Sequence, residues 1–354
     1  MPAKLFKPKC LATAIGSLPF AESKSAYELV LKYLPEIPVS PEFPMMGYKH
    51  TFCGPFLENL PGLVADDKRE IFYFNTSIDN SGEFEKFYEN YLSGNLDYFK
   101  ISYERGIGFY NLLKMLQTTR PSNIQYFKTQ MPGPITTGLT IKDETDKNII
   151  YNEEFMQIII KAIVMKAKWQ INEIKKTFPD IIFFFDEPGL VNYGSSYFNI
   201  EKNYIIQCLN EVFEAVNVTT GSHCCGNTDW SILMESKVNI ISFDAYTYSG
   251  AMVMYPDHLK KFLSRNGCLA WGIIPNSQKI FNHTPEALAE KLENEINILV
   301  QKGFSKKDIL NASLITPACG LGSATQDIAQ KVLWTLQRVS MILRTKYSLN
   351  NDLI

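Results

Sequence analysis

The sequence of 354 residues predicts an α/β protein with a (β/α)8 TIM barrel and an insertion at the barrel mouth. Short apolar or β-branched runs that end in Gly, Pro, Asp or Cys recur along the chain, and an amphipathic helical stretch follows most of them. This alternation is typical of parallel βαβ units. Eight strands of this kind are expected, which favours a closed barrel over an open doubly wound sheet.

The second half of the chain carries five of the expected strands. They are predicted over residues 181–186, 218–225, 239–244, 268–274 and 313–319. Helices are predicted at about 199–216, 229–237, 257–266, 284–303 and 325–346.

The first half is less regular. Strands are expected at residues 11–17 and 124–130, with a weak one near 37–39. Region 40–122 contains irregular stretches and two expected helices, at about 81–92 and 104–116, that fit no simple βα unit. We interpret 40–122 as an irregular insertion on the substrate side, within one barrel domain that spans residues 1–354.

Charge and composition narrow the classes of partner. Lys and Arg supply 35 positive charges and Asp and Glu 37 negative ones, so the net charge of −2 indicates neither a nucleic-acid nor a membrane partner. No apolar stretch of about 18 residues is present to cross a bilayer. Seven cysteines, an odd number spread along the chain, do not resemble a disulfide framework. We therefore expect a cytoplasmic protein that acts on a small molecule or on another protein.

A cluster of soft metal ligands is expected at the barrel mouth. In GSHCCG, His223 and Cys225 are two residues apart at a strand end, so both face the same side while Cys224 faces the other. Cys319 and Asp244 end two further strands. Zinc prefers this set of ligands, although buried cysteines are also common as small core residues.

Polar residues at other strand ends could bind a substrate. Asp186 and Glu187 follow three phenylalanines, where a carboxylate could hold an ammonium group or act as a base, or could simply belong to a turn. Ser17, after Gly16, could donate to a carboxylate, although Gly-Ser is also common in turns. The polar run 128–130 is a weaker candidate. GLGSA lacks the third glycine of a dinucleotide fingerprint, so a nucleotide cofactor is not expected.

Four motifs occur together in a characteristic order. AIGSLP, FFFDEPG, HCCG and PACGLG, each at a predicted strand end, resemble the C-terminal barrel of cobalamin-independent methionine synthase. They also resemble the related zinc methyltransferases that act on methylated corrinoid proteins, within the uroporphyrinogen decarboxylase-like superfamily. The resemblance covers about residues 10–345.

The resemblance implies specific roles for the metal ligands. The His-x-Cys and distant Cys-Gly motifs fall on His223, Cys225 and Cys319, which implies a bound Zn²⁺. The synthase adds an acidic ligand, a Glu, and the nearest position in this chain is Asp244, which is shorter by one methylene.

The resemblance also implies a binding site for an amino acid. Gly16, Ser17 and Asp186 match the motifs that contact its carboxylate and amine, and Glu187 adjoins Asp186. The synthase's second amine-binding acid has no secure match, and Glu42 in SPEFP is the nearest suggestion.

The expected function is zinc-dependent transfer of a methyl group to a thiol such as homocysteine. Because the sequence resembles neither the folate-binding half of the synthase nor a corrinoid-binding domain, the expected donor is methylcobalamin or a related methylcorrinoid, either free or on a separate corrinoid protein. Homocysteine, coenzyme M and folate remain open as acceptors. The alternatives are a non-catalytic module that binds a corrinoid or methylated ligand, and a decarboxylase-like enzyme. The arginines that such decarboxylases carry near the first strand are missing from LPFAESKSAY.

Overall fold

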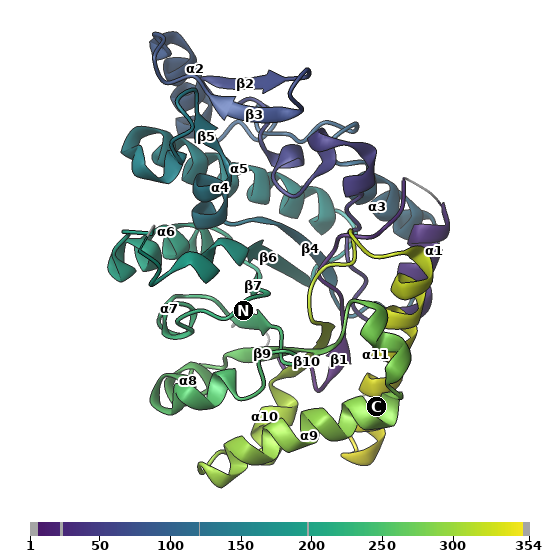
Figure 1. Ribbon diagram of the computed structural model, residues 1–354. Coiled ribbons are helices and arrows are strands. Elements are labelled where there is room, and N and C mark those ends of the chain that lie inside the picture. Colours follow the sequence, from purple (N-terminus) through teal and green to yellow (C-terminus); the bar gives the residue numbers. More distant parts are fainter. Residues whose placement is uncertain (1–5, 22–23, 120, 197, 350–354) are drawn as a thin grey trace.

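A computed structural model describes residues 6–21, 24–119, 121–196 and 198–349. Seven parallel strands form one curled sheet in the order β1-β10-β9-β8-β7-β6-β4 (Figure 1). Their bounds are β1 (Leu11–Ala12), β4 (Phe127–Pro132), β6 (Ile181–Asp186), β7 (Thr219–Cys224), β8 (Ile240–Phe243), β9 (Cys268–Ile274) and β10 (Ser313–Pro317). The alternating α/β architecture is as predicted, and the first predicted strand is much shorter than expected.

The expected strand near 37–39 is an extended segment rather than a regular strand. Val39 forms an isolated parallel bridge with Lys128 of β4, and the Ser40 amide donates to the Lys128 carbonyl at 2.8 Å. Pro38 and Pro41 flank this bridge and have no amide hydrogen to donate, so a continuous ladder cannot form.

The same segment also reaches the loop after β1, on the other edge of the sheet. The Glu42 amide donates to the Gly16 carbonyl at 3.1 Å, and the Leu18 amide donates to the Glu42 carbonyl at 2.9 Å. The structure therefore contains a curled sheet of seven strands whose two edge regions are joined by an irregular segment, where the sequence predicted eight regular strands.

Helices surround the sheet (Figure 1). The helices predicted in the second half agree closely with α6 (Lys202–Glu214), α7 (Ser231–Glu235), α8 (Pro256–Ser264), α9 (Pro285–Gln301) and α11 (Gln326–Lys346). The remaining helices are α1 (Lys24–Tyr33), α2 (Ser81–Leu92), α3 (Ile107–Thr119), α4 (Pro134–Thr140), α5 (Glu153–Lys175) and α10 (Lys306–Asn311).

Region 40–122 contains two different kinds of structure. β2 (Leu63–Asp66) and β3 (Ile71–Phe74) form an antiparallel hairpin, and β5 (Lys142–Asp143) adds to it as a third strand at the top of Figure 1. α3 instead packs in the helical layer, because the ring of Phe109 contacts Phe127 of β4 and Trp169 of α5.

The inner face of the sheet has its own apolar core. Because side chains alternate along each strand, residues of one phase point inward from every strand. The inner cluster contains Leu11, Ile37, Ile182, Phe184, Ile240, Cys268, Ala270 and Leu314. Asp186 continues the phase of Ile182 and Phe184, so the end of β6 directs its carboxylate to the same side.

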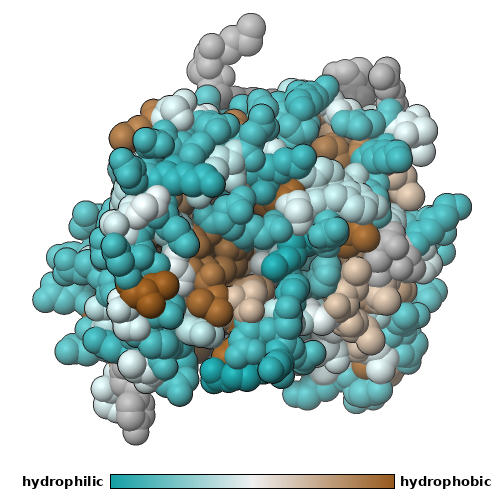
Figure 2. Space-filling model, turned by 90° about the horizontal axis from the view of Figure 1, so that it is seen from above, coloured by the Kyte–Doolittle hydropathy of each residue, from teal (hydrophilic) through white to brown (hydrophobic). Residues whose placement is uncertain are grey.

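None of the helices within the described ranges is both long enough and apolar enough to cross a bilayer. The face shown in Figure 2 is mostly hydrophilic, with hydrophobic side chains gathered in a recess.

Glu187 fastens the end of β6 to the start of α4. Its buried carboxylate accepts hydrogen bonds from the amides of Ile135 (3.0 Å) and Thr136 (2.7 Å) and from the Thr136 hydroxyl (2.6 Å). A carboxylate that accepts several donors at a helix start compensates for its own desolvation and for that of the amides.

We predict that Glu187→Gln lowers the free energy of unfolding by about 2–4 kcal/mol, because an amide NH2 then faces buried donors that have lost an acceptor. Urea denaturation measures this loss. The control, Glu214→Gln at the exposed end of α6, should change stability by less than about 0.5 kcal/mol. Equal stability of the two variants would contradict the anchoring role of Glu187.

Candidate functional site

A cavity of about 360 Å³ opens where the carboxyl ends of the strands meet. Several residues that the sequence singled out line it together, although they come from distant parts of the chain. They are Ser17, Glu42, Asp186, His223, Cys225 and Cys319.

Three of these side chains form a compact group of ligand atoms. One nitrogen of His223 and the sulfurs of Cys225 and Cys319 lie within 4.8 Å of one another. The Oγ of Ser242, on β8, lies 2.9 Å from His223 Nδ1 and fixes the ring. His223 Nε2 is buried and has no hydrogen-bond partner of acceptable geometry among the described residues. A buried nitrogen of this kind is explained if it binds a metal ion.

The two thiols differ in their affinity for a proton. The hydrogen bond with Cys319, followed by the neighbouring His223 ring, holds the pKa of Cys225 well below its usual range. The same hydrogen bond, together with burial, raises the pKa of Cys319. A thiolate beside a second thiol forms a site suited to a soft cation.

Zinc fits this donor set. Two sulfurs and one imidazole nitrogen match the three-ligand sites in which zinc retains an open position. Cys224 lies on the opposite face of β7, where it is packed in the outer core, as strand alternation requires. Asp244 is outside the group of three, and its Oδ1 accepts a hydrogen bond from the Thr247 amide at 2.8 Å.

Asp186 is the unpaired acid of the cavity. Its side chain is buried, and neither carboxylate oxygen has a hydrogen-bond partner within the described part of the chain. Burial raises the pKa of Asp186 to about 6, although the nearby charges of Lys128 and His223 lower it. A buried carboxylate without a partner is a suitable site for a cationic group of a ligand.

The two other predicted acids have different surroundings. Glu42 lines the same cavity, and its Oε1 accepts a hydrogen bond from Gln130 Nε2 at 3.0 Å. Burial raises the pKa of Glu42 to about 7. Glu187, which the sequence placed with the substrate, faces α4 instead, because it follows Asp186 directly and therefore leaves the strand on the other side.

Gly16 and Ser17 form one wall of the cavity. Gly16 has a φ of +136°, and a side chain at this position would collide with the amide of Gln130, so glycine is required there. The Ser17 hydroxyl oxygen accepts a hydrogen bond from the Gly322 amide at 3.3 Å. This bond leaves the hydroxyl hydrogen of Ser17 available as a donor toward the cavity.

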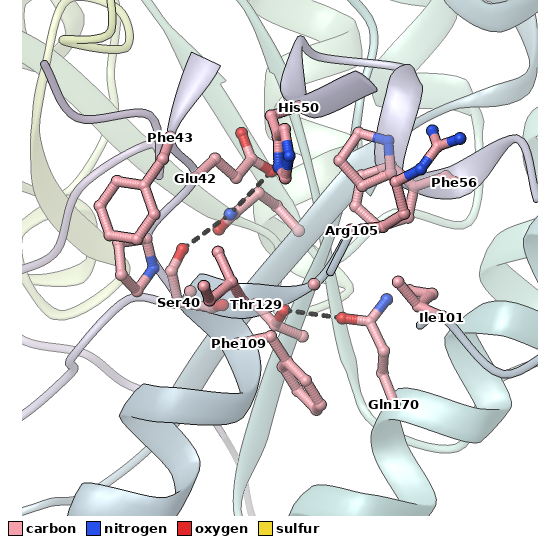
Figure 3. A pocket seen from close by; sticks show the side chains of 16 residues that line it. Ser40, Glu42, Phe43, His50, Phe56, Ile101, Arg105, Phe109, Thr129 and Gln170 are labelled. Atoms are coloured by element: carbon pink, nitrogen blue, oxygen red, sulfur yellow. Dashed lines mark hydrogen bonds between the residues drawn. The ribbon is translucent and has the colours of Figure 1, made fainter. Parts of the chain in front are cut away.

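Sequence reasoning did not single out the contribution of the loop after Glu42. His50 and Phe52 line the cavity, and His50 also borders a smaller cavity of about 40 Å³ beside Arg105 and Gln170 (Figure 3). The sequence placed region 40–122 at the barrel mouth, which indicated that some of its residues would line the site. No local motif identified His50 or Phe52 as those residues.

Comparison with known proteins gives a likeness of fold. No protein-family model and no characterised protein sequence matches the chain. A solved B12-independent methionine synthase from Shewanella sp. W3-18-1, in complex with selenomethionine, has a TM-score of 0.59 and 16% identity over 96% of this chain and 99% of that one. At this identity the likeness shows the fold alone.

Two further solved structures have much lower scores. One is an uncharacterised protein, with a TM-score of 0.32 and 13% identity over 67% of this chain and 61% of that one. The other is an amidohydrolase from Burkholderia ambifaria with bound Zn, with a TM-score of 0.31 and 10% identity over 98% and 97%. These scores support no inference about this chain.

We predict that the protein binds one zinc ion and that Cys225→Ala abolishes this binding, because one of the three ligand atoms is removed. Cys224→Ala is the matched control, since its sulfur points into the outer core, and should retain the metal. Elemental analysis of both variants, purified without chelator, measures the difference. Loss of zinc from Cys224→Ala alone would show that the inward-facing phase of β7 is assigned wrongly.

Proposed function

We propose that the protein is a zinc-dependent methyltransferase that transfers a methyl group to the thiol of homocysteine. The observation that carries this proposal is the joint presence, in one cavity, of a two-sulfur, one-nitrogen metal site and an unpaired buried carboxylate. The first feature suits a thiol and the second an amine, and homocysteine carries both groups.

The proposed metal ligands are His223, Cys225 and Cys319. Zinc bound there would favour the thiolate form of a substrate thiol and keep its sulfur nucleophilic. Ser242 would hold the His223 ring so that Nε2 faces the cavity. In the transfer, a sulfur–carbon bond forms as the donor–carbon bond breaks, the donor keeps the electron pair, and the thiol proton is lost.

The remaining polar groups would orient the amino acid. Asp186 and Glu42 would bind the ammonium group, which would supply the hydrogen-bond donors that the Asp186 carboxylate lacks. Ser17 would donate its hydroxyl hydrogen to the substrate carboxylate. A sulfonate such as coenzyme M is disfavoured as acceptor, because two acids line the cavity and a sulfonate brings no amine.

The Shewanella enzyme supports the choice of acceptor. It is described as a methionine synthase, and methionine is methylated homocysteine; its bound ligand is the selenium analogue of methionine. A likeness at the level of the fold makes this chemistry a proposal for the present chain.

The donor is a separate part of the proposal. We propose methylcobalamin or a related methylcorrinoid, free or carried by a partner protein, as the sequence resemblance implied. The description of the Shewanella enzyme as B12-independent weighs against a corrinoid. A non-catalytic binding module would bind the thiol but give no product with any donor.

We predict that the protein with zinc forms methionine from homocysteine and methylcobalamin, and that methyl-folate is a much poorer donor. Chromatographic detection of methionine, with Cys225→Ala as the inactive control, measures both reactions. Brisk turnover with methyl-folate alone would overturn the donor assignment, while methyl transfer to homocysteine would stand. Thiol binding without turnover from either donor would favour the binding module.

We predict that Asp186→Asn weakens homocysteine binding by about 2–4 kcal/mol, or roughly 30- to 1,000-fold in Kd, because the ammonium group loses one of its two charged partners in a desolvated site. 4-Mercaptobutyrate is homocysteine without the amine, and its affinity should change by less than about threefold. Isothermal titration calorimetry measures both affinities. An equal loss for the two thiols would contradict the role of Asp186 in binding the amine.

A further inference from the structure

Glu42 lies in an irregular segment, so no helix or strand of its own holds its side chain in place. It follows Pro41 in the irregular stretch that joins the edges of the sheet, and its amide and carbonyl form hydrogen bonds with the loop after β1. Its carboxylate nevertheless lines the proposed substrate cavity. Something outside this segment must therefore fix the direction of the side chain.

Gln130 of β4 makes that connection. Its Nε2 donates to Glu42 Oε1 at 3.0 Å and to the Ser40 carbonyl at 2.9 Å, and Figure 3 shows both bonds as dashed lines. Gln130 is 2% exposed, so water does not compete for these bonds. The absence of a side chain at Gly16 makes room for the amide.

Lys128 determines which way the Gln130 amide faces. Its buried ammonium group donates to Gln130 Oε1 at 3.4 Å and to the Ile15 carbonyl at 3.4 Å, and lies 4.2 Å from the centre of the Phe184 ring. A flipped amide would place its NH2 against the ammonium group and its oxygen against a carbonyl and a carboxylate. The observed orientation places the amide oxygen toward the ammonium group and the NH2 toward two acceptors, which the flipped amide would not do.

We propose that Gln130 is a positioning residue which, held by Lys128, aims the carboxylate of Glu42 at the ammonium group of the substrate. The proposal deepens the proposed function and rests on it for the identity of the substrate. Gln130 is not a catalytic residue, because it acts on the substrate only through Glu42. A ligand without an amine should therefore be insensitive to it.

The test is Gln130→Met, which keeps the shape of the side chain and removes its three hydrogen bonds, to Glu42, Ser40 and Lys128. The expected result is a Kd for homocysteine roughly tenfold higher, with less than a twofold change for 4-mercaptobutyrate. The KM for homocysteine should rise with kcat unchanged. Thr129→Val is the matched control: it removes a buried hydrogen bond to Gln170 on the opposite face of the same strand and should leave both affinities unchanged.

Lys128→Met is a second variant that tests the same chain of contacts. It should also weaken homocysteine selectively, because Gln130 loses the contact that orients its amide and the carboxylates of Asp186 and Glu42 lose a neighbouring positive charge. The double variant should lose less affinity than the sum of the single losses, because both residues influence Glu42. Equal losses for the two thiols, or an unchanged homocysteine affinity in Gln130→Met, would overturn the proposal.

A crystal structure of Gln130→Met separates this inference from the proposed function. Glu42 should adopt a different side-chain orientation there and keep its orientation in Thr129→Val. An unmoved Glu42 would contradict the positioning role whatever the ligand is. Wild-type protein that binds neither thiol would instead contradict the proposed function, and the orientation of Glu42 would still decide whether Gln130 positions it.

Discussion

Charged groups removed from water need partners, and this requirement shapes the inner face of the sheet. On the inner face of the sheet, the buried cluster below the cavity is apolar and includes Phe184. Lys128 is buried beside Phe184, between this apolar cluster and the polar side chains of the cavity. Lys128 has carbonyl, amide and aromatic partners, and Glu42 has Gln130. Among the described residues that line the cavity, Asp186 and Nε2 of His223 lack a hydrogen-bond partner, and we propose that they bind substrate and metal.

The unpaired groups are held in place by the hydrogen-bonded scaffold around them. β6, β7 and β10 deliver Asp186, the His223–Cys225 pair and Cys319 to one edge of the sheet, and their positions are fixed by hydrogen bonds between adjacent strands. Glu187 ties the end of β6 to α4, so the strand end that carries Asp186 cannot shift without breaking three hydrogen bonds. This fixed geometry suits the ligand that we propose, which brings both a thiol and an amine.

The sequence predicted the parts of the fold that depend on local pattern. The continuous apolar runs 181–186 and 268–274 agree with β6 and β9 residue for residue, and strand alternation correctly put Cys224 on the outer face. Residues 37–39 do not form the predicted regular strand, because Pro38 and Pro41 have no amide hydrogen to donate to a neighbouring strand. The same alternation also applies to Glu187. Because Glu187 follows Asp186 directly, the alternation predicts that its side chain points to the opposite side of the sheet, where α4 lies.

Contacts between distant segments could not be predicted in this way. The pairing of Gln130 with Glu42 depends on how β4 meets an irregular segment nearly 90 residues earlier in the chain. Glu42 itself was suggested only by resemblance, and His50 by nothing local. Hydrogen bonds of this kind are set by tertiary structure, which a single sequence pattern does not encode.

The central claim is that a substrate thiol and the three side chains share one zinc ion. X-ray absorption at the zinc edge measures it most directly, on the metal-loaded protein with and without homocysteine. We predict that the number of sulfur ligands rises from two to three when homocysteine binds. An unchanged number of sulfur ligands, under conditions where calorimetry shows homocysteine bound, would contradict the claim.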